Sequence, residues 1–456
     1  MATTATMAAT AGKRAVVVGL GLTGLSCVRH LVARGYDVRV VDSRREPPSL
    51  QALRTEFPGI PVHAGDFAAD WLAAAELLVV SPGVSLREPA LARALAAGAE
   101  AVGDVELFAR EARAPVIAVT GSNGKSTVTS LVGAMCAAAG LDVRVGGNIG
   151  VPALALLGTR EPDVYVLELS SFQLETTHSL NARAAVVLNL TPDHMDRYRD
   201  LAEYGAAKRR IFRGDGVMVL NADDAAVRAM AQPGREARGF TLGAPRPGAD
   251  YGVRTRGDEA WLVCGDEPIL RASEVPLPGR HNLANALAAA ALADALGVPR
   301  AAQREAIRAF RGLPHRTEHV AEIDGVRFIN DSKGTNVGAT VAALTGMGAP
   351  VVLIAGGDGK GQDFTELRDA CAAHARAVVL MGRDADRIEA AIAGAVPMQR
   401  AADLREAVAA ARRLARPGDV VLLSPACASF DMFRDYVHRG ETFRAAVQEL
   451  LTGAGR

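Results

Sequence analysis

The sequence has few aromatic residues and few cysteines. Only 4% of its 456 residues are Phe, Trp or Tyr, whereas 49% are hydrophobic, so small aliphatic side chains must fill most of the interior. Such side chains are typical of helices packed on parallel sheets rather than of an all-β sandwich. The cysteines stand singly, which argues against a disulfide framework or a thiolate metal site; they are Cys27, Cys136, Cys264, Cys371 and Cys427. We therefore expect an α/β protein with reduced thiols.

The sequence also lacks an excess of either charge and any long apolar run. Lys plus Arg and Asp plus Glu both total 51, so no overall field attracts nucleic acid or a membrane surface. No stretch approaches the roughly 18 apolar residues of a membrane-spanning helix. Residues 1–14 lack the basic start and apolar core of a signal peptide, and we expect them to form a disordered leader. These absences predict a cytoplasmic protein whose anionic ligands are held by local features.

The clearest local feature is a phosphate-binding loop at residues 116–130, VIAVTGSNGKSTVTS. An apolar strand followed by a Gly-rich turn and a helix directs backbone N–H groups and the helix N-terminus at one point, where phosphates can be held. Lys125 would reach the outer phosphates and Ser126 a bound Mg²⁺. Gly121 and Gly124 are separated by two residues rather than the usual four. The alternative is an ordinary strand-to-helix turn with a solvated lysine.

A second Gly-rich turn lies near the N-terminus. Gly19, Gly21 and Gly24 form GxGxxG between an apolar run and a helix closed by Gly35, and the next strand ends at Asp42. This context predicts a site for a dinucleotide or a nucleotide diphosphate, with the pyrophosphate at the helix N-terminus. The alternative is that the glycines serve only helix–sheet packing. A further strand, LLVVSPGV, places residues 81–83 at the same edge of the sheet.

Acidic and imidazole side chains follow two strands after the phosphate loop. We expect strands in VYVLELSSFQL (residues 164–174) and AVVLNLTPDHMDRY (residues 185–198), with Glu168 at the end of one and Asp193, His194 and Asp196 past the end of the other. Carboxylate and imidazole groups there would complete the coordination of Mg²⁺ on phosphate oxygens. Lys208 lies on a predicted helix beside two arginines, and the residues alone favour a solvated face.

The remainder of the chain alternates strands and helices. Asn282 and Asn285 lie one turn apart on a predicted helix, where they would contact a nucleobase or cap the helix. Residues 246–267 resemble a polar hairpin. A doubly wound sheet after residue 313 should gather the loops 331–336, 356–361 and 424–430 at one edge.

Nine ordered motifs spread over nearly the whole chain resemble the Mur ligase family. They are TGSNGKST, GGNIG, ELSSFQLE, TPDHMDRY, GRHNLANA, LPHR, NDSKGTN, GGDGK and SPACASFD. GLGLTGLS, SPGV, ELSSFQLE and SPACAS narrow the resemblance to the branch that adds D-glutamate. The resemblance implies peptidoglycan precursor synthesis, in which ATP phosphorylates the carboxylate of UDP-N-acetylmuramoyl-L-alanine and the amine of D-glutamate attacks the acyl phosphate.

The resemblance also implies site residues. The catalytic residues would be Lys125, Glu168, His194 and Lys208, the lysine being carbamylated and, with Ser126, Glu168 and His194, holding two Mg²⁺. ATP would contact Gly121, Ser122, Asn123, Gly124, Lys125, Ser126, Thr127, Asn282, Asn285, Arg316, Asp331 and Lys333. The UDP substrate would contact Leu22, Thr23, Asp42, Ser43, Arg44, Ser81, Gly83, Asn148, Gln173 and His194. D-Glutamate would contact Thr335, Lys360, Ser429, Phe430 and Tyr436, and the last two stand where the family has Leu and Phe.

We therefore expect three domains: a Rossmann-like UDP-substrate domain (1–103), a central phosphate-loop ATPase domain with a mostly parallel sheet (104–312), and a Rossmann-like domain binding ATP and D-glutamate (313–456). The protein is expected to be a monomer. A nicotinamide oxidoreductase would use the GxGxxG but would leave the phosphate loop without a role. A sister ligase or a folate polyglutamating enzyme would differ in the first and last domains. A non-catalytic nucleotide-binding protein would be expected to have lost Lys125, Glu168 or His194.

Overall fold

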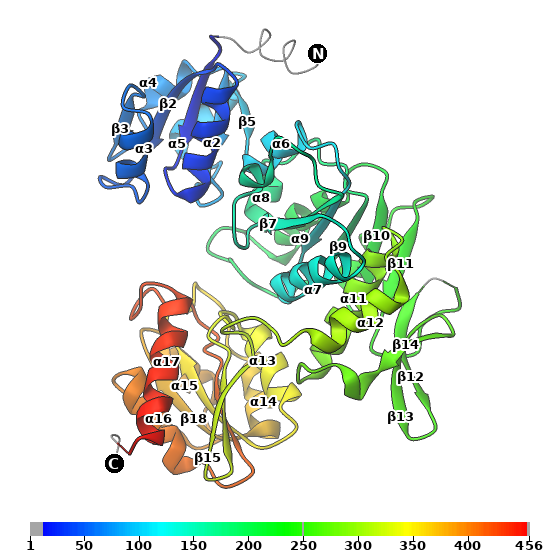
Figure 1. The fold of residues 1–456 in the computed structure, drawn as a ribbon. Coiled ribbons are helices and arrows are strands. Elements are labelled where there is room, and N and C mark those ends of the chain that lie inside the picture. The colour runs from blue at the N-terminus through cyan, green and yellow to red at the C-terminus, as the bar shows by residue number, and fades with distance from the viewer. Residues whose placement is uncertain (1–11, 249, 454–456) are drawn as a thin grey trace.

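The computed structural model describes residues 12–248 and 250–453. Figure 1 shows three lobes that follow one another along the chain, from the blue N-terminal lobe through the cyan and green central one to the yellow and red C-terminal one. Residues 1–11 of the expected leader lie outside the described range. Within that range, no helix combines the length and apolar character needed to cross a membrane. The α/β fold with three domains is confirmed.

The N-terminal domain is a five-stranded parallel sheet in the order β3-β2-β1-β4-β5. Its elements are β1 (Arg14–Val18), α2 (Leu22–Ala33), β2 (Asp37–Asp42), α3 (Leu50–Glu56), β3 (Val62–Ala64), α4 (Ala69–Ala73), β4 (Leu77–Val80), α5 (Pro89–Ala96) and β5 (Glu100–Val102). Side chains of β1 alternate between two buried clusters, one on each face, as a strand of period two requires. The three-residue strands β3 and β5 escaped prediction because they are too short to show a pattern.

The central domain contains a nine-stranded sheet in the order β14-β13-β12-β11-β10-β9-β6-β8-β7. Its elements are α6 (Asp104–Ala109), β6 (Val116–Thr120), α7 (Lys125–Ala138), β7 (Val143–Gly147), β8 (Val164–Glu168), α8 (Ser171–Glu175), β9 (Ala184–Val187), α9 (Leu201–Arg209), β10 (Val217–Asn221), α10 (Ala225–Arg228), β11 (Ala237–Phe240), β12 (Tyr251–Arg256), β13 (Glu259–Cys264), β14 (Glu267–Arg271), α11 (Arg280–Asp294) and α12 (Arg300–Ala309).

The order of this sheet brings the predicted site loops together. β6 lies between β8 and β9 and is parallel to both, so the loops that follow these three strands meet at one edge. β12, β13 and β14 form the antiparallel end of the sheet, which confirms the predicted hairpin. The alanine-rich helix α11 packs against α7 with residues 285–293 buried.

The C-terminal domain has a six-stranded sheet in the order β15-β16-β20-β17-β18-β19, of which only the β15–β16 pair is antiparallel. Its elements are β15 (Glu318–Ile323), β16 (Val326–Asn330), α13 (Val337–Gly346), β17 (Val351–Gly356), α14 (Glu366–His374), β18 (Ala375–Met381), α15 (Ala385–Ile392), β19 (Met398–Arg400), α16 (Leu404–Leu414), β20 (Val420–Leu423) and α17 (Tyr436–Leu451). The three loops predicted to share an edge do so: Ser424 Oγ donates to Asp331 Oδ2 (2.8 Å), and Asp358 and Ala428 exchange backbone hydrogen bonds of 3.0 and 2.8 Å.

The strands expected within residues 164–174 and 185–198 end early in these segments, which confirms Glu168 at the end of one strand and Asp193 past the end of the other. β8 stops at Glu168 and α8 begins at Ser171 because Ser170 and Gln173 form a capping box: Ser170 Oγ accepts the Gln173 N–H (3.2 Å) and Gln173 Oε1 accepts the Ser170 N–H (3.1 Å). β9 likewise ends at Val187, so the TPDHMDRY segment is a loop. The divisions at 103/104 and 312/313 fall between the three sheets and remain the boundaries that we propose.

Candidate functional site

The phosphate-binding loop requires glycine at both of its predicted positions. Gly121 and Gly124 have φ values of +154° and +84°, a region that side chains rarely enter. A Cβ atom at Gly121 would lie 2.9 Å from Leu188 Cβ, and one at Gly124 would lie 2.5 Å from Asn285 Oδ1. The shortened loop therefore passes directly from β6 into α7, whose N-terminus opens toward the sheet edge, as an anion site requires.

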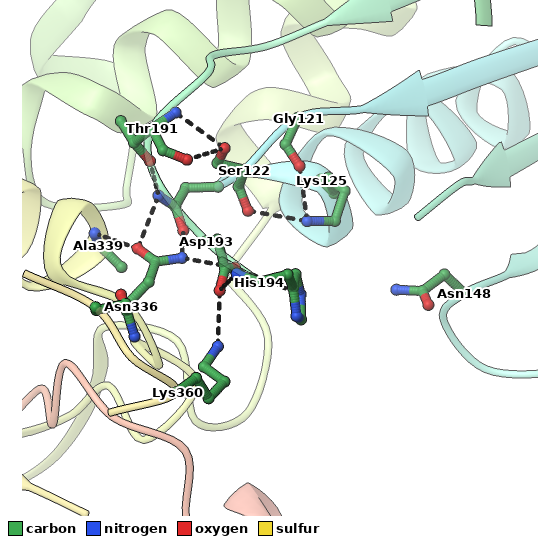
Figure 2. Close-up of polar contacts among 12 residues, drawn as sticks. Gly121, Ser122, Lys125, Asn148, Thr191, Asp193, His194, Asn336, Ala339 and Lys360 are labelled. Carbon is green, nitrogen blue, oxygen red and sulfur yellow. Dashed lines mark hydrogen bonds and ion pairs between the residues drawn. The ribbon is translucent and has the colours of Figure 1, made fainter. Parts of the chain in front are cut away.

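Lys125 lies over this loop. Its Nζ donates to the carbonyls of Gly121 and Ser122, both at 2.9 Å (Figure 2). Burial lowers the pKa of Lys125 below its ordinary value, while Glu168 and Asp193 act in the opposite direction. A cation fixed at this position is suited to neutralise charge on phosphate oxygens held by the loop.

Ser126 and Glu168 supply adjacent oxygen atoms. Ser126 Oγ donates to Glu168 Oε2 (2.5 Å), and Asn148 Nδ2 donates to the other carboxylate oxygen (2.7 Å). Hydroxyl and carboxylate oxygens are ligands that Mg²⁺ prefers. Among the described residues, no three His, Cys, Asp or Glu side chains gather as in a site made of protein ligands alone. The residues thus fit an Mg²⁺ ion that takes its other ligands from phosphate and water.

Lys208 is buried, so the interpretation as a solvated face is wrong. Its side chain extends from α9 to the phosphate loop, where Nζ donates to the Gly121 carbonyl (2.8 Å), the same oxygen that Lys125 contacts. Its Nζ also lies 4.5 Å from the centre of the Tyr204 ring. Burial lowers the pKa of Lys208 well below its ordinary value, and the charge of Lys125 lowers it further. An amine in this environment favours the neutral form.

His194 and Asp193 lie in the loop after β9. His194 has a φ of +58°, uncommon for a residue with a side chain, and its ring meets the edge of Phe172 at 4.7 Å between centroids. Burial lowers the pKa of His194 to about 4, although Asp193 opposes the shift. The imidazole is therefore neutral at pH 7, the form that binds a metal ion.

Several side-chain contacts join the C-terminal domain to the phosphate-loop domain. Arg316 Nη2 donates to Ser126 Oγ (2.6 Å). Lys360 Nζ pairs with Asp193 Oδ1 (2.7 Å). Asn336 donates to the other oxygen of Asp193 (3.1 Å), and Figure 2 shows Asn336 and Lys360 meeting this carboxylate. Burial would raise the pKa of Asp193, but Lys360 and His194 hold it below its ordinary value, so the carboxylate is charged.

Asn123 of the phosphate loop also faces Asn336. Each amide donates to the carbonyl oxygen of the other, at 3.2 and 3.1 Å. Asn189 holds Asn123 from behind, because its Oδ1 accepts the Asn123 N–H (2.8 Å). Asn123 was predicted to contact ATP, but its pairing with Asn336 was not predicted, because the two residues lie on different domains and each stands in a motif that also contains charged residues. The C-terminal domain is thus closed against the central one.

A cavity of about 320 Å³ lies where these two domains meet. The predicted ATP residues among its lining are Asn123, Gly124, Thr127, Asn282, Asn285, Arg316, Asp331 and Lys333. Its lining also includes Asn189, Asn221, Asp223, His281 and Thr317, which sequence reasoning missed. Asn221 ends β10, a strand parallel to β9, and Asp223 follows it; this position at a strand end was an available signal. Asn282 donates to the Pro278 carbonyl (2.7 Å) and accepts from Asn285 (3.1 Å), so it braces the start of α11 while lining the cavity.

Asp331 and Lys333 have unusual environments at this cavity. Burial raises the pKa of Asp331 to about 6, although the hydrogen bond from Ser424 opposes the shift. Burial lowers the pKa of Lys333 to about 8, and Arg316 adds to this effect. The ammonium group of Lys333 lies 3.7 Å from the ring centre of Tyr436, an arrangement that stabilises a buried cation.

A second cavity, of about 590 Å³, lies between the N-terminal and central domains. It contains nine of the ten residues predicted for the UDP substrate: Leu22, Thr23, Asp42, Ser43, Arg44, Ser81, Gly83, Asn148 and Gln173. His194 is not among its lining residues. The carboxylate of Asp42 accepts the Leu20 N–H (2.7 Å) and the Arg44 guanidinium (2.6 and 2.9 Å). Asp42 therefore shapes the Gly-rich turn and orients Arg44, which is half exposed.

The five residues predicted for D-glutamate are less closely grouped. None of them lines either cavity among the described residues. Lys360 contacts Asp193, the ring of Tyr436 covers Lys333, and Phe430 is 73% exposed. Ser429 is buried and Thr335 is partly buried in the loops at the shared edge of the C-terminal sheet.

Three family models together match most of the chain. They are described as Mur ligase MurD-like, N-terminal domain (residues 13–103), Mur ligase middle domain (119–293) and Mur ligase, glutamate ligase domain (315–427).

Curated relatives are similar over almost their full length. A UDP-N-acetylmuramoylalanine–D-glutamate ligase from Nitrosococcus oceani is 57% identical, with 96% of this chain and 97% of the relative covered. The protein of the same name from Marinobacter nauticus is 54% identical, with 96% and 98% covered.

Solved structures share the fold at lower identity. A UDP-N-acetylmuramate-alanine ligase from Thermotoga maritima superposes with a TM-score of 0.60 at 21% identity, covering 96% of this chain and 99% of that one. A pseudomurein peptide ligase from Methanothermus fervidus gives a TM-score of 0.61 at 18% identity, covering 96% and 100%.

Proposed function

The chain belongs to the Mur ligase family, and from this membership we infer that it is the ATP-dependent ligase that adds D-glutamate to UDP-N-acetylmuramoyl-L-alanine in peptidoglycan synthesis. The observation that carries this conclusion is identity above 50%, across all three domains, to curated ligases of that name. A sister ligase or a folate enzyme would be expected to diverge in the first and last domains, and an oxidoreductase would leave the phosphate loop without a role.

The reaction requires ATP to phosphorylate the substrate carboxylate before the amine of D-glutamate attacks it. Positioning and charge neutralisation contribute most to such a phosphoryl transfer. We assign the phosphate chain to the loop 121–124 and to Lys125, whose amine already lies over the loop carbonyls. Mg²⁺, when bound, supplies further neutralisation of phosphate charge, and Ser126, Glu168 and His194 are the residues that would hold it.

Asn148 supports a continuous path from the UDP-substrate cavity to the phosphate loop. It lines that cavity and donates to Glu168, which contacts Ser126. A substrate held by its UDP group between residues 22, 44 and 83 would therefore direct its muramoyl-alanine end past Asn148 toward the phosphates. We propose that Gln173 and His194 border this end.

For D-glutamate, a dianion, we propose Lys360 as the cationic partner and Thr335 and Ser429 as neutral donors. Support comes from the loops at the shared edge of the C-terminal sheet, which carry all three residues, and from the contact of Lys360 with Asp193. In the assembled complex the glutamate amine would then face the phosphorylated carboxylate across the closed domain interface. Phe430 and Tyr436 would form the apolar border.

We further propose that Lys208 is carbamylated and that two Mg²⁺ ions take part. A buried amine with a lowered pKa is largely neutral, and a neutral amine is the form that reacts with CO₂. The carbamate would place a carboxylate beside the phosphate loop, where the described residues otherwise lack a three-residue acidic cluster. A mass increase of the purified protein that is lost in Lys208→Ala tests the modification directly.

The reaction itself is tested by phosphate release from ATP with UDP-N-acetylmuramoyl-L-alanine and one amino acid. D-Glutamate should support release, whereas L-glutamate, L-alanine and meso-diaminopimelate should not. Release with another of these amino acids alone would reassign the substrate. We propose a monomer, since both cavities are lined within one chain, and a cytoplasmic location, in keeping with five free cysteines.

A further inference from the structure

One guanidinium group connects the N-terminal domain to the central domain. Arg197 donates from Nη1 to the Pro82 carbonyl (2.9 Å) and from Nη2 to the Val84 carbonyl (3.3 Å). Both carbonyls belong to the loop after β4, which lines the UDP-substrate cavity. The Arg197 side chain is only 13% exposed, so water competes little for these hydrogen bonds.

The same guanidinium is held by the central domain. Its Nη2 pairs with Glu175 Oε2 (2.6 Å), and the group lies 4.2 Å from the ring centre of Phe172. Tyr198 donates its hydroxyl to the other oxygen of Glu175 (2.6 Å). Phe172 and Glu175 belong to α8, the helix whose Gln173 lines the same cavity. Arg197 therefore contacts the elements that form both walls of the UDP-substrate site.

Arg197 is also coupled to His194. The ring of Phe172 contacts the guanidinium on one side and the imidazole on another, and the His194 carbonyl accepts the Arg197 N–H (3.0 Å). A second arginine crosses the joint in the opposite direction: Arg87 of the N-terminal domain donates to the Arg197 carbonyl (3.4 Å) and pairs with Glu203 of α9. The domain joint and the His194 loop thus form one hydrogen-bonded unit.

We propose that Arg197 is a positioning residue that fixes the UDP-binding domain relative to the catalytic centre. The inference rests on the proposed function, in which one domain holds UDP and the next one activates the carboxylate at the other end of the same substrate. Binding of the UDP group aids the reaction only if it also places the carboxylate at the other end of the substrate correctly in the catalytic centre. A misplacement of about 1 Å can cost roughly a hundredfold in rate. Arg197 fixes the relative position of the two domains without contacting the reacting atoms.

Binding measurements with two ligands test the proposal. Titration calorimetry with UDP reports the N-terminal domain, whereas UDP-N-acetylmuramoyl-L-alanine reports both domains. In Arg197→Ala, UDP should bind within about twofold of wild type, while the additional affinity of the full substrate should fall by about tenfold or more, as expected for lost charged hydrogen bonds. kcat for phosphate release should fall as well.

Two further variants calibrate the result. Arg197→Lys should be intermediate, because an ammonium group can pair with Glu175 but cannot match the planar fork that also reaches two carbonyls. Arg199→Ala is the matched control, since this arginine of the same loop is 76% exposed and its guanidinium pairs with Glu203 of the central domain; it should behave as wild type.

The proposal would be overturned if Arg197→Ala kept both the wild-type kcat and the additional affinity of the full substrate over UDP. An equal loss of affinity for both ligands would also overturn it, because that result indicates general damage. If Arg197→Ala does not fold, the same affinity ratio in Arg197→Lys decides. A wild-type protein that binds UDP but neither binds the full substrate nor releases phosphate would instead refute the proposed function.

Discussion

Replacing Asn336 with serine should weaken closure of the C-terminal domain without unfolding it. The Asn336 side chain caps α13, since its Oδ1 accepts the Ala339 N–H (2.8 Å). It also exchanges two hydrogen bonds with Asn123 and donates to Asp193 across the domain interface. Serine is an equally good helix cap but is too short to make the interdomain bonds. The substitution therefore separates the two roles.

The magnitude follows from the bonds that are lost. A neutral hydrogen bond contributes about 1 kcal/mol and one to a charged group about 1.5–3 kcal/mol, so the three bonds together amount to about 3–5 kcal/mol. Water molecules that enter the opened interface replace some of the lost hydrogen bonds. We therefore expect a net loss of about 2 kcal/mol in the free energy of closure, or about thirtyfold in the closure equilibrium. The contacts of Arg316 and Lys360 remain, so closure should be weakened rather than abolished.

Kinetics and scattering measure the effect. kcat/KM for D-glutamate should fall by about ten- to thirtyfold, since closure is needed to join the two half-sites and exclude water, while affinity for the UDP substrate should not change. Small-angle scattering with an ATP analogue and the UDP substrate should show a larger radius of gyration than wild type. The flexible point should lie near residues 312–314, where Gly312 has a φ of +88°.

A matched control tests the cap alone. Asp403 caps α16 in the same domain by accepting the Glu406 N–H (2.8 Å), and it is exposed. Asp403→Ser should leave both kinetics and scattering unchanged. If Asn336→Ser keeps wild-type kcat/KM for D-glutamate and the wild-type scattering profile, the interdomain bonds do not determine closure and the reasoning fails.

Three other predictions concern the ATP site. Lys125→Ala should nearly abolish phosphate release while calorimetric affinity for the UDP substrate is retained, because the two sites lie in different cavities; loss of both together would contradict the assignment of the domains. Lys208→Ala should be inactive and partly rescued by short carboxylates that replace the carbamate oxygens; full activity without any modification of Lys208 in wild type would refute its role. Burial raises the pKa of Asp331 from 3.8 to about 6, so its contribution to stability is present below pH 3.8 and is lost as pH rises toward 6. Calorimetry should therefore show Asp331→Asn gaining in Tm relative to wild type between pH 4 and 6 and no further above it, and a constant difference over that range would contradict the burial argument.

Local sequence determined the parts of this protein that depend on neighbouring residues. The phosphate loop, the GxGxxG turn and the α/β class follow from apolar runs, glycines and short spacings, because the conformations of a turn and a helix start are set within a few residues. The gathering of three loops at the edge of the C-terminal sheet followed as well, since parallel strands always present the same ends to one side.

Tertiary structure decided the properties that arise from distant segments. The residues around Lys208 suggest a solvated helix face, yet α9 packs against the phosphate loop and buries its amine. Asp42 ends a strand and was assigned to the UDP substrate, and only the fold shows that the Leu20 N–H and Arg44 hold its carboxylate. Arg197 lies in the TPDHMDRY motif, but the sequence does not show its partners; it links two domains because its guanidinium donates to the Pro82 and Val84 carbonyls. The burial of a side chain, its pKa and the relative position of two domains depend on which surfaces pack together in the folded protein. A local sequence pattern does not encode this packing.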